Sequence, residues 1–123
     1  MPWVRFEDDY LFNGKVRGIG PFARLLDMSA IIYSARELRD GQLSPEEVKM
    51  IATLVKIPKW KPAADDLVVH GRWELHIEPP LYVIHDYLKY QPSREKILAQ
   101  READRLRKVH GGQVRHTPNG ATV

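Results

Sequence analysis

The chain has 123 residues, 43% of them apolar and 28% charged, a composition typical of a soluble globular domain rather than a disordered chain. No apolar run approaches the roughly 18 residues of a membrane-spanning helix. The first residues lack the basic-then-apolar layout of a secretory signal. We therefore expect a cytoplasmic protein without a membrane partner. The absence of cysteine excludes disulfides, zinc ribbons and thiol catalysis.

The positive charge of the chain is concentrated near its C-terminal end. The net charge is +3 at pH 7 and the pI is about 9.3. Residues 94–123 alone carry seven Lys or Arg against three Asp or Glu. A basic segment on a nearly neutral body is typical of an arm that contacts a polyanion such as nucleic acid. The alternative interpretation is a helix face whose charges are only solvated.

The first third of the chain predicts a short strand and one long helix. Residues 2–7 are aromatic and β-branched and predict the strand. Residues 8–20 predict a loop with room for one helical turn. Apolar residues then recur at helical spacing over 21–39, beginning at Pro21. Asp40-Gly41 is the predicted end of this helix, with the glycine in the left-handed conformation.

The middle of the chain predicts two shorter helices and a β-hairpin. Ser44 and Glu47 form a capping box, which predicts a helix over 45–56. A third helix is predicted over 62–70, ended by Gly71. The hairpin strands are predicted at 73–77 and 81–85, joined by Pro79-Pro80.

The remaining residues predict a basic helix and a tail. A charged helix is expected over 94–109, and residues 110–123 lack periodicity and predict disorder. The expected organisation is therefore a folded domain at 1–92, a basic C-terminal helix at 93–109 and a disordered tail at 110–123. Trp3, Trp60 and Trp73 are expected to anchor the core of the folded domain.

The order strand, helix, helix, helix, hairpin, helix is that of a winged helix-turn-helix. We therefore expect an α+β, mainly helical fold with a short N-terminal strand, a three-helix core, a β-hairpin wing and a C-terminal helix. Each helix has one apolar stripe and the hairpin has one apolar face. These surfaces can share a single core.

Three stretches of the sequence resemble a known family. They are Pro2-Trp3-Val4-Arg5-Phe6-Glu7-Asp8-Asp9, Leu67-Val68-x-x-Gly71-x-Trp73-Glu74 and Ile84-His85-Asp86-Tyr87-Leu88-x-Tyr90-Gln91-Pro92-Ser93-Arg94-Glu95. They resemble small winged helix-turn-helix proteins of actinobacterial phages, which are similar to the N-terminal domains of phage replication initiators and replisome organisers. The resemblance covers most of residues 1–108, and it implies a DNA-binding protein.

The third predicted helix is the candidate for reading DNA. In this fold the N-terminal residues of that helix enter the major groove. The candidate phosphate contacts beside it are Lys56, Lys59 and Lys61. Asp65 and Asp66 oppose this function because carboxylates repel phosphate. Their structural interpretation is a favourable interaction with the helix dipole.

The wing and the last helix supply the other candidate contacts. They are Arg72 and His76 in the wing, and Arg94, Arg101, Arg105 and Lys108 in the last helix. The four cations of the last helix follow a 7-4-3 spacing, which places them on one helical face. Such a stripe can follow a phosphate backbone. The alternative is that the interleaved Glu95, Glu102 and Asp104 pair with them within the helix.

Nothing in the sequence indicates catalysis, a metal or a cofactor. His70, His76 and His85 do not have the spacing of a metal-ligand set, and no cysteine completes one. His85-Asp86 resembles half of a catalytic pair, but no serine or cysteine lies in a nucleophile motif. Asp86 is instead expected to cap the turn that follows it.

The sequence as a whole predicts a non-catalytic DNA-binding protein, and the resemblance implies a part in phage-type DNA replication or its control. Duplex DNA is the expected partner. The alternatives are a protein-interaction module without DNA reading, or a transcriptional repressor of the same fold. Asp65 and Asp66 favour the interaction module. In that case the last helix would contact a replication protein or a second copy of the chain as a homodimer.

Overall fold

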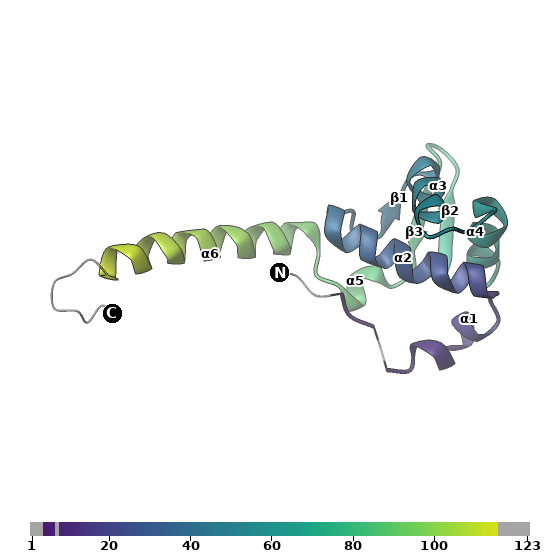
Figure 1. Cartoon of the computed structure of the whole chain (residues 1–123), viewed down its shortest axis with the longest axis horizontal. Coiled ribbons are helices and arrows are strands. Elements are labelled where there is room, and N and C mark those ends of the chain that lie inside the picture. The colour runs from purple at the N-terminus through teal and green to yellow at the C-terminus, as the bar shows by residue number, and fades with distance from the viewer. Residues whose placement is uncertain (1–3, 7, 116–123) are drawn as a thin grey trace. The chain divides into compact units, whose positions relative to one another are not determined.

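A computed structural model describes residues 4–6 and 8–115, the last six of these as backbone only. The chain divides into two compact units, Met1–Gln91 and Pro92–Val123. The first is an α+β fold with a small antiparallel sheet, and the second contains one long helix (Figure 1). In the part of the chain so described, no helix combines the length and apolar content needed to cross a membrane.

The first unit contains most of the secondary structure. Its elements are the 3-10 turn η1 (Tyr10–Phe12), α1 (Gly14–Arg17), α2 (Pro21–Glu37), β1 (Gln42–Leu43), α3 (Pro45–Leu54), α4 (Trp60–Val69), β2 (Trp73–His76), β3 (Leu81–Ile84) and α5 (Tyr87–Tyr90). The second unit contains α6 (Arg94–Arg115). The three predicted central helices and the hairpin are therefore present, while β1 and α5 were not predicted.

The sheet has the strand order β1-β3-β2, with both pairs antiparallel. Trp73 lies opposite Ile84, and Leu43 lies opposite Tyr82. All four of these side chains are buried. The predicted hairpin is confirmed, and the alternation of its residues explains which face is buried. Because β1 has only two residues, it has no alternation from which it could be predicted.

The core lies where α2, α3 and α4 pack against one another and against the sheet (Figure 1). Leu26, Val48 and Leu67 contribute one fully buried side chain from each helix. Trp73 and Tyr82 add aromatic contacts from the sheet, with ring centroids 5.7 Å apart. Burying such side chains contributes about 1.5–3 kcal/mol each, which makes this cluster the main stabilising element of the unit.

The tryptophan anchors are confirmed where the structure describes them. Trp73 is buried, and Trp60 packs edge-on against Tyr82 with ring centroids 6.3 Å apart. Trp3 lies outside the described residues.

The starts of α3 and α4 show how local sequence sets the helix ends. The Ser44 side chain accepts a hydrogen bond from the Glu47 amide, and the Glu47 carboxylate accepts one from the Ser44 amide, so the capping box is confirmed. α4 begins at Trp60, two residues before the predicted start. Pro62 therefore lies within the first turn. There its missing N–H costs nothing, because the first four amides of a helix lack intrahelical acceptors.

The predicted end of α2 at Asp40-Gly41 is wrong. The helix ends at Glu37, and Leu38 takes the left-handed conformation with φ 55°. Gly41 also has a positive φ of 79°, but it lies beyond the helix against α5. A Cβ atom on Gly41 would lie only 2.6 Å from the Cβ atom of Tyr87. The glycine is required by this close approach as well as by its backbone angle.

Two predictions at the chain ends are also corrected. Residues 4–6 have no regular structure, so the N-terminal strand is not present there, and residues 2, 3 and 7 lie outside the described residues. Residues 110–115 belong to α6 rather than to a disordered tail, and 116–123 lie outside the described residues. Elongating an existing helix adds one hydrogen bond per residue, which offsets the weak helix propensity of the two glycines there.

Candidate functional site

The lysines before α4 lie in an exposed turn between two helices. Lys56 follows the end of α3 with a positive φ of 67°, and Lys59 is the N-cap residue of α4. Both side chains are exposed. Neither has an ion pair or side-chain hydrogen bond to any residue that the structure describes. Their charges are therefore available to a ligand at the N-terminal end of α4.

Lys61 lies on α4 itself and is paired with an acidic neighbour. Its Nζ donates to Oδ1 of Asp65 at 2.8 Å, one helical turn away. This hydrogen bond raises the pKa of Lys61. Both side chains remain about half exposed. An exposed helix pair of this kind contributes only about 0.3–0.5 kcal/mol, so a phosphate can compete for Lys61.

Asp66 has a structural role that differs from the one predicted. Because α4 begins at Trp60, the first turn contains no acidic residue, and the expected interaction with the helix N-terminus is wrong. Oδ2 of Asp66 instead accepts a hydrogen bond from the Gly20 amide at 2.8 Å. The other carboxylate oxygen of Asp66, Oδ1, lies 3.0 Å from Nδ1 of His70. Asp66 thus joins the start of α2 to α4.

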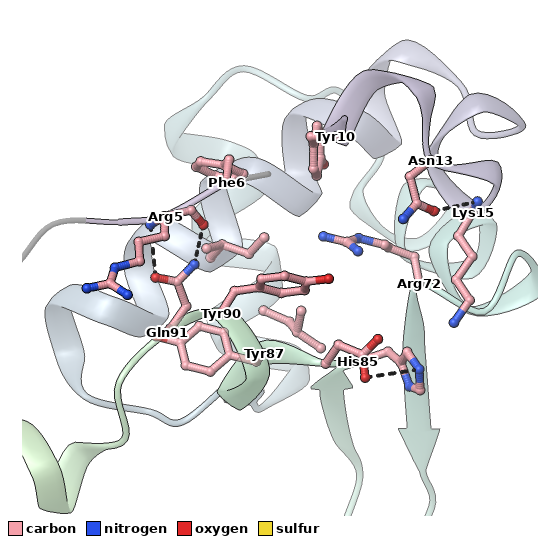
Figure 2. A pocket seen from close by; sticks show the side chains of 13 residues that line it. Arg5, Phe6, Tyr10, Asn13, Lys15, Arg72, His85, Tyr87, Tyr90 and Gln91 are labelled. Atoms are coloured by element: carbon pink, nitrogen blue, oxygen red, sulfur yellow. Dashed lines mark hydrogen bonds and ion pairs between the residues drawn. The ribbon is translucent and has the colours of Figure 1, made fainter. Parts of the chain in front are cut away.

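Arg72 lies at the start of the hairpin but does not point out from it. Its Nε donates to Oδ2 of Asp27 at 2.7 Å, and its side chain is only 12% exposed. Figure 2 shows the guanidinium directed into a pocket beside the Tyr10 ring, whose centroid lies 5.2 Å away. This placement favours a structural or pocket-lining role for Arg72 over a contact with a DNA backbone.

The partner of Arg72 is a fully buried carboxylate that was not among the predicted site residues. Asp27 accepts hydrogen bonds from the Tyr10 hydroxyl at 2.5 Å and from Nε1 of Trp73 at 2.9 Å, in addition to Arg72. Burial and the nearby carboxylate raise the pKa of Tyr10 far above its ordinary value. The sequence held one signal for this cluster, an aspartate between the apolar residues Leu26 and Met28 of the helix. Its partners are 17 to 46 residues away and follow no local pattern.

The hairpin histidines lie beside acidic residues. Nε2 of His76 is 3.7 Å from the Glu74 carboxylate, and Nδ1 of His85 is 3.5 Å from the same group. Asp86 precedes α5 at the N-cap position, but its side chain makes no capping hydrogen bond and lies 3.4 Å from His85 instead. Within residues 4–6 and 8–109, no three histidines or carboxylates are grouped to hold a metal ion.

Between Arg94 and Lys108 the cations of α6 are all exposed, and only some of them have an ion-pair partner. Arg94, Arg101, Arg105 and Lys108 lie on one continuous helix, as their spacing requires. Arg105 is paired with Glu102, and Arg107 is paired with Asp104. The alternative of pairing within the helix is therefore realised for these two arginines. Arg101 and Lys108 make no ion pair with the residues described and remain available to a polyanion.

Comparisons of this chain with models of protein families, with curated proteins and with solved structures found no match. The arrangement of the residues is therefore the basis for a functional proposal. That arrangement separates the predicted contacts into exposed cations near α4 and on α6, and one arginine that faces an internal pocket.

Proposed function

We propose that this protein is a winged-helix protein that binds duplex DNA without acting on it as an enzyme. The observation that carries the proposal is the combination of a β1-β3-β2 sheet with unpaired lysines at the start of α4. In a winged helix, a helix and a first strand precede two helices and a hairpin, and the first strand pairs with the last. The order α2, β1, α3, α4, β2, β3 follows that plan.

The lysines beside α4 give the proposal its mechanism. The amino end of a helix carries a partial positive charge and unpaired amide groups, which favour a phosphate. Lys56 and Lys59 add full charges at this end, and each phosphate that they neutralise releases counterions. Lys61, one residue into α4, reaches a phosphate or a base edge when its exposed pair with Asp65 opens.

The helix α6 supplies a second set of contacts for the DNA backbone. Arg101 and Lys108 are seven residues apart, so they lie two turns apart on one face of α6. Arg94 and Arg105 lie on the same face, Arg105 with Glu102 as its partner. We also propose a role in phage-type DNA replication or its control. The reason is that the stretch from Ile84 to Glu95 resembles small winged helix-turn-helix proteins of actinobacterial phages.

Fluorescence anisotropy with a short duplex DNA at several salt concentrations tests the proposal. Neutralising the two unpaired lysines in Lys56→Gln/Lys59→Gln should weaken binding at low salt. It should also reduce the slope of log K against log salt by about 1.8, since each lost phosphate contact removes about 0.9.

The matched control is Arg36→Gln/Lys49→Gln, which removes two exposed charges from α2 and α3. The control should keep the slope of the unchanged protein. Absence of binding at low salt, or an equal loss in both variants, would rule out a DNA contact at the start of α4.

One observation favours a second function, a protein-interaction module. The outer face of α2 exposes Phe22, Leu25 and Ile32, which are 51%, 40% and 52% exposed and share one side of the helix. Exposed apolar side chains gathered on one side of a helix are a candidate surface for a protein contact. Absent DNA binding, together with a complex with a purified replication protein that Ile32→Glu abolishes, would favour this function. A palindromic DNA target and a stable dimer would instead indicate a repressor.

A further inference from the structure

A small pocket lies between the N-terminal segment and the base of the hairpin. Its volume is about 80 Å³. Five side chains of the N-terminal segment, Ile31 of α2, Arg72 and six side chains from the end of β3 through α5 line it (Figure 2). Aromatic side chains of Phe6, Tyr10 and Tyr90 form part of these walls. This pocket is not used by the DNA contact proposed above.

Arg72 supplies the main polar group of the pocket. Its Nε is occupied by Asp27, but no residue that the structure describes accepts a hydrogen bond from its two terminal nitrogens. Figure 2 shows these nitrogens directed into the pocket. Asp27 already receives donors from Tyr10 and Trp73, so its charge is shared among three partners. The outer edge of the guanidinium is left as a two-pronged donor.

The charges around the pocket favour an anion. Lys15 lines the pocket beside Arg72, while Asp86 is the one acidic residue among its described lining residues and lies against His85. The Arg5 guanidinium points outward in Figure 2, and its backbone instead exchanges hydrogen bonds with the Gln91 side chain. Gln91 thereby holds the N-terminal segment in place as one wall of the pocket.

We propose that this pocket binds a single small oxyanion group, either a carboxylate or a phosphate, through the terminal nitrogens of Arg72. Two parallel guanidinium N–H groups match the spacing of two oxygens on such a group. The pocket is small, at about 80 Å³, which suits a single oxyanion group better than a larger ligand. Lys15 adds a second positive charge, and Asp27 holds the guanidinium in its orientation.

NMR titration of the whole chain tests this proposal directly. The Nε–H signal of Arg72 and the Nε1–H signal of Trp73 report on the group of side chains around Asp27, because both N–H groups donate hydrogen bonds to the Asp27 carboxylate. We expect the chemical shift of the Arg72 signal to change and then saturate as inorganic phosphate or acetate is added. The anion that saturates the change at the lower concentration shows whether the pocket prefers a phosphate or a carboxylate. Sodium chloride at the same ionic strength should give no saturable shift. A linear response to all three salts would overturn the proposal.

Two variants link the shift to the pocket. Arg72→Lys keeps a charge beside Asp27 but removes the two-pronged donor, and it should weaken binding, followed through the Nε1–H signal of Trp73, at least tenfold. Lys15→Glu should weaken it at least threefold, whereas Lys49→Glu on α3 should leave it unchanged. If Arg72→Lys does not fold, the comparison of anion affinity between Lys15→Glu and Lys49→Glu tests whether the anion binds in this pocket. Binding that survives the Lys15 change would contradict the proposal. None of these residues belongs to the proposed DNA contact, so either proposal can fail alone.

Discussion

A single buried carboxylate organises the chemistry of the first unit. Asp27 is fully buried on α2 and receives hydrogen bonds from three side chains that belong to the N-terminal segment and the start of the hairpin. A buried charge costs several kcal/mol unless it is paired and hydrogen-bonded. Here the three donors meet that requirement, and they also fix where Arg72 points. Asp27 therefore contributes both to the stability of the fold and to the shape of the pocket that Arg72 lines.

Replacing this carboxylate tests the cluster. Asp27→Asn keeps the side-chain size but leaves the Arg72 guanidinium without a counter-charge, and should lower the free energy of unfolding by about 3–5 kcal/mol. Urea denaturation followed by circular dichroism measures the change. Asp65→Asn breaks an exposed pair instead and should cost at most about 1 kcal/mol. Equal effects of the two changes would show that the buried pair does not stabilise the fold.

Among the elements, α3 has the most complete N-terminal cap. Oε1 of Glu47 accepts from the Ser44 amide at 2.9 Å and from Arg39 at 3.0 Å, and Oε2 accepts from Tyr33 at 2.8 Å. Burial by itself would raise the pKa of Glu47, but these donors outweigh burial and lower it. The same donors tie α3 to the end of α2. The cap therefore stabilises a contact between helices as well as one helix end.

The lowered pKa of Glu47 predicts a specific acid sensitivity. The folded state binds the Glu47 proton less tightly than the unfolded chain does, so this carboxylate stabilises the fold above its ordinary pKa of 4.5. That contribution is lost as the pH falls below this value. Glu47→Gln should cost about 1–2 kcal/mol at neutral pH, and the difference from the unchanged protein should shrink in acid.

Urea denaturation at several pH values measures this difference. Glu46→Gln, one residue earlier and exposed, is the control: it removes only the interaction of a first-turn carboxylate with the helix N-terminus, and should show a smaller loss and a weaker pH dependence. A Glu47→Gln difference that stays constant from neutral to acid pH would contradict the assigned role.

At the scale of the whole molecule, the two units differ in what their side chains contribute. Every residue of the buried core cluster lies between Tyr10 and Tyr87, within the first unit. α6 is rich in charged residues and carries half-exposed apolar side chains such as Leu98 and Leu106. The first unit therefore contains the hydrophobic core that stabilises a domain, while α6 contributes mainly charged side chains.

Truncation after Gln91 tests this division. The shortened chain, residues 1–91, should fold cooperatively with a melting temperature within a few degrees of the full chain, because its core is intact. It should bind duplex DNA more weakly and with a smaller salt slope, since Arg101, Arg105 and Lys108 are removed. Calorimetry and anisotropy measure the two effects. Loss of folding would show that α6 is part of the core, and unchanged DNA affinity would exclude α6 from the contact.

The amino-acid sequence by itself determined the elements whose signals are local. The capping box at Ser44 and Glu47, the apolar periodicity of α2 and the alternation in the hairpin depend on residues within a few positions of one another. The lysines beside α4 and the arginines of α6 were found for the same reason, because charge clusters are visible along the chain.

Only the tertiary structure decided how distant residues meet. It paired β1 with β3, placed Gly41 against Tyr87 and joined Asp66 to Gly20. Arg72 was predicted to contact DNA from the surface, but in the folded chain it donates a hydrogen bond to Asp27, 45 residues earlier in the chain. These contacts follow from which faces are buried together, and burial depends on the packing of all elements at once. Local patterns therefore predict helices, strands and charge, while pairs of buried polar groups require the folded chain.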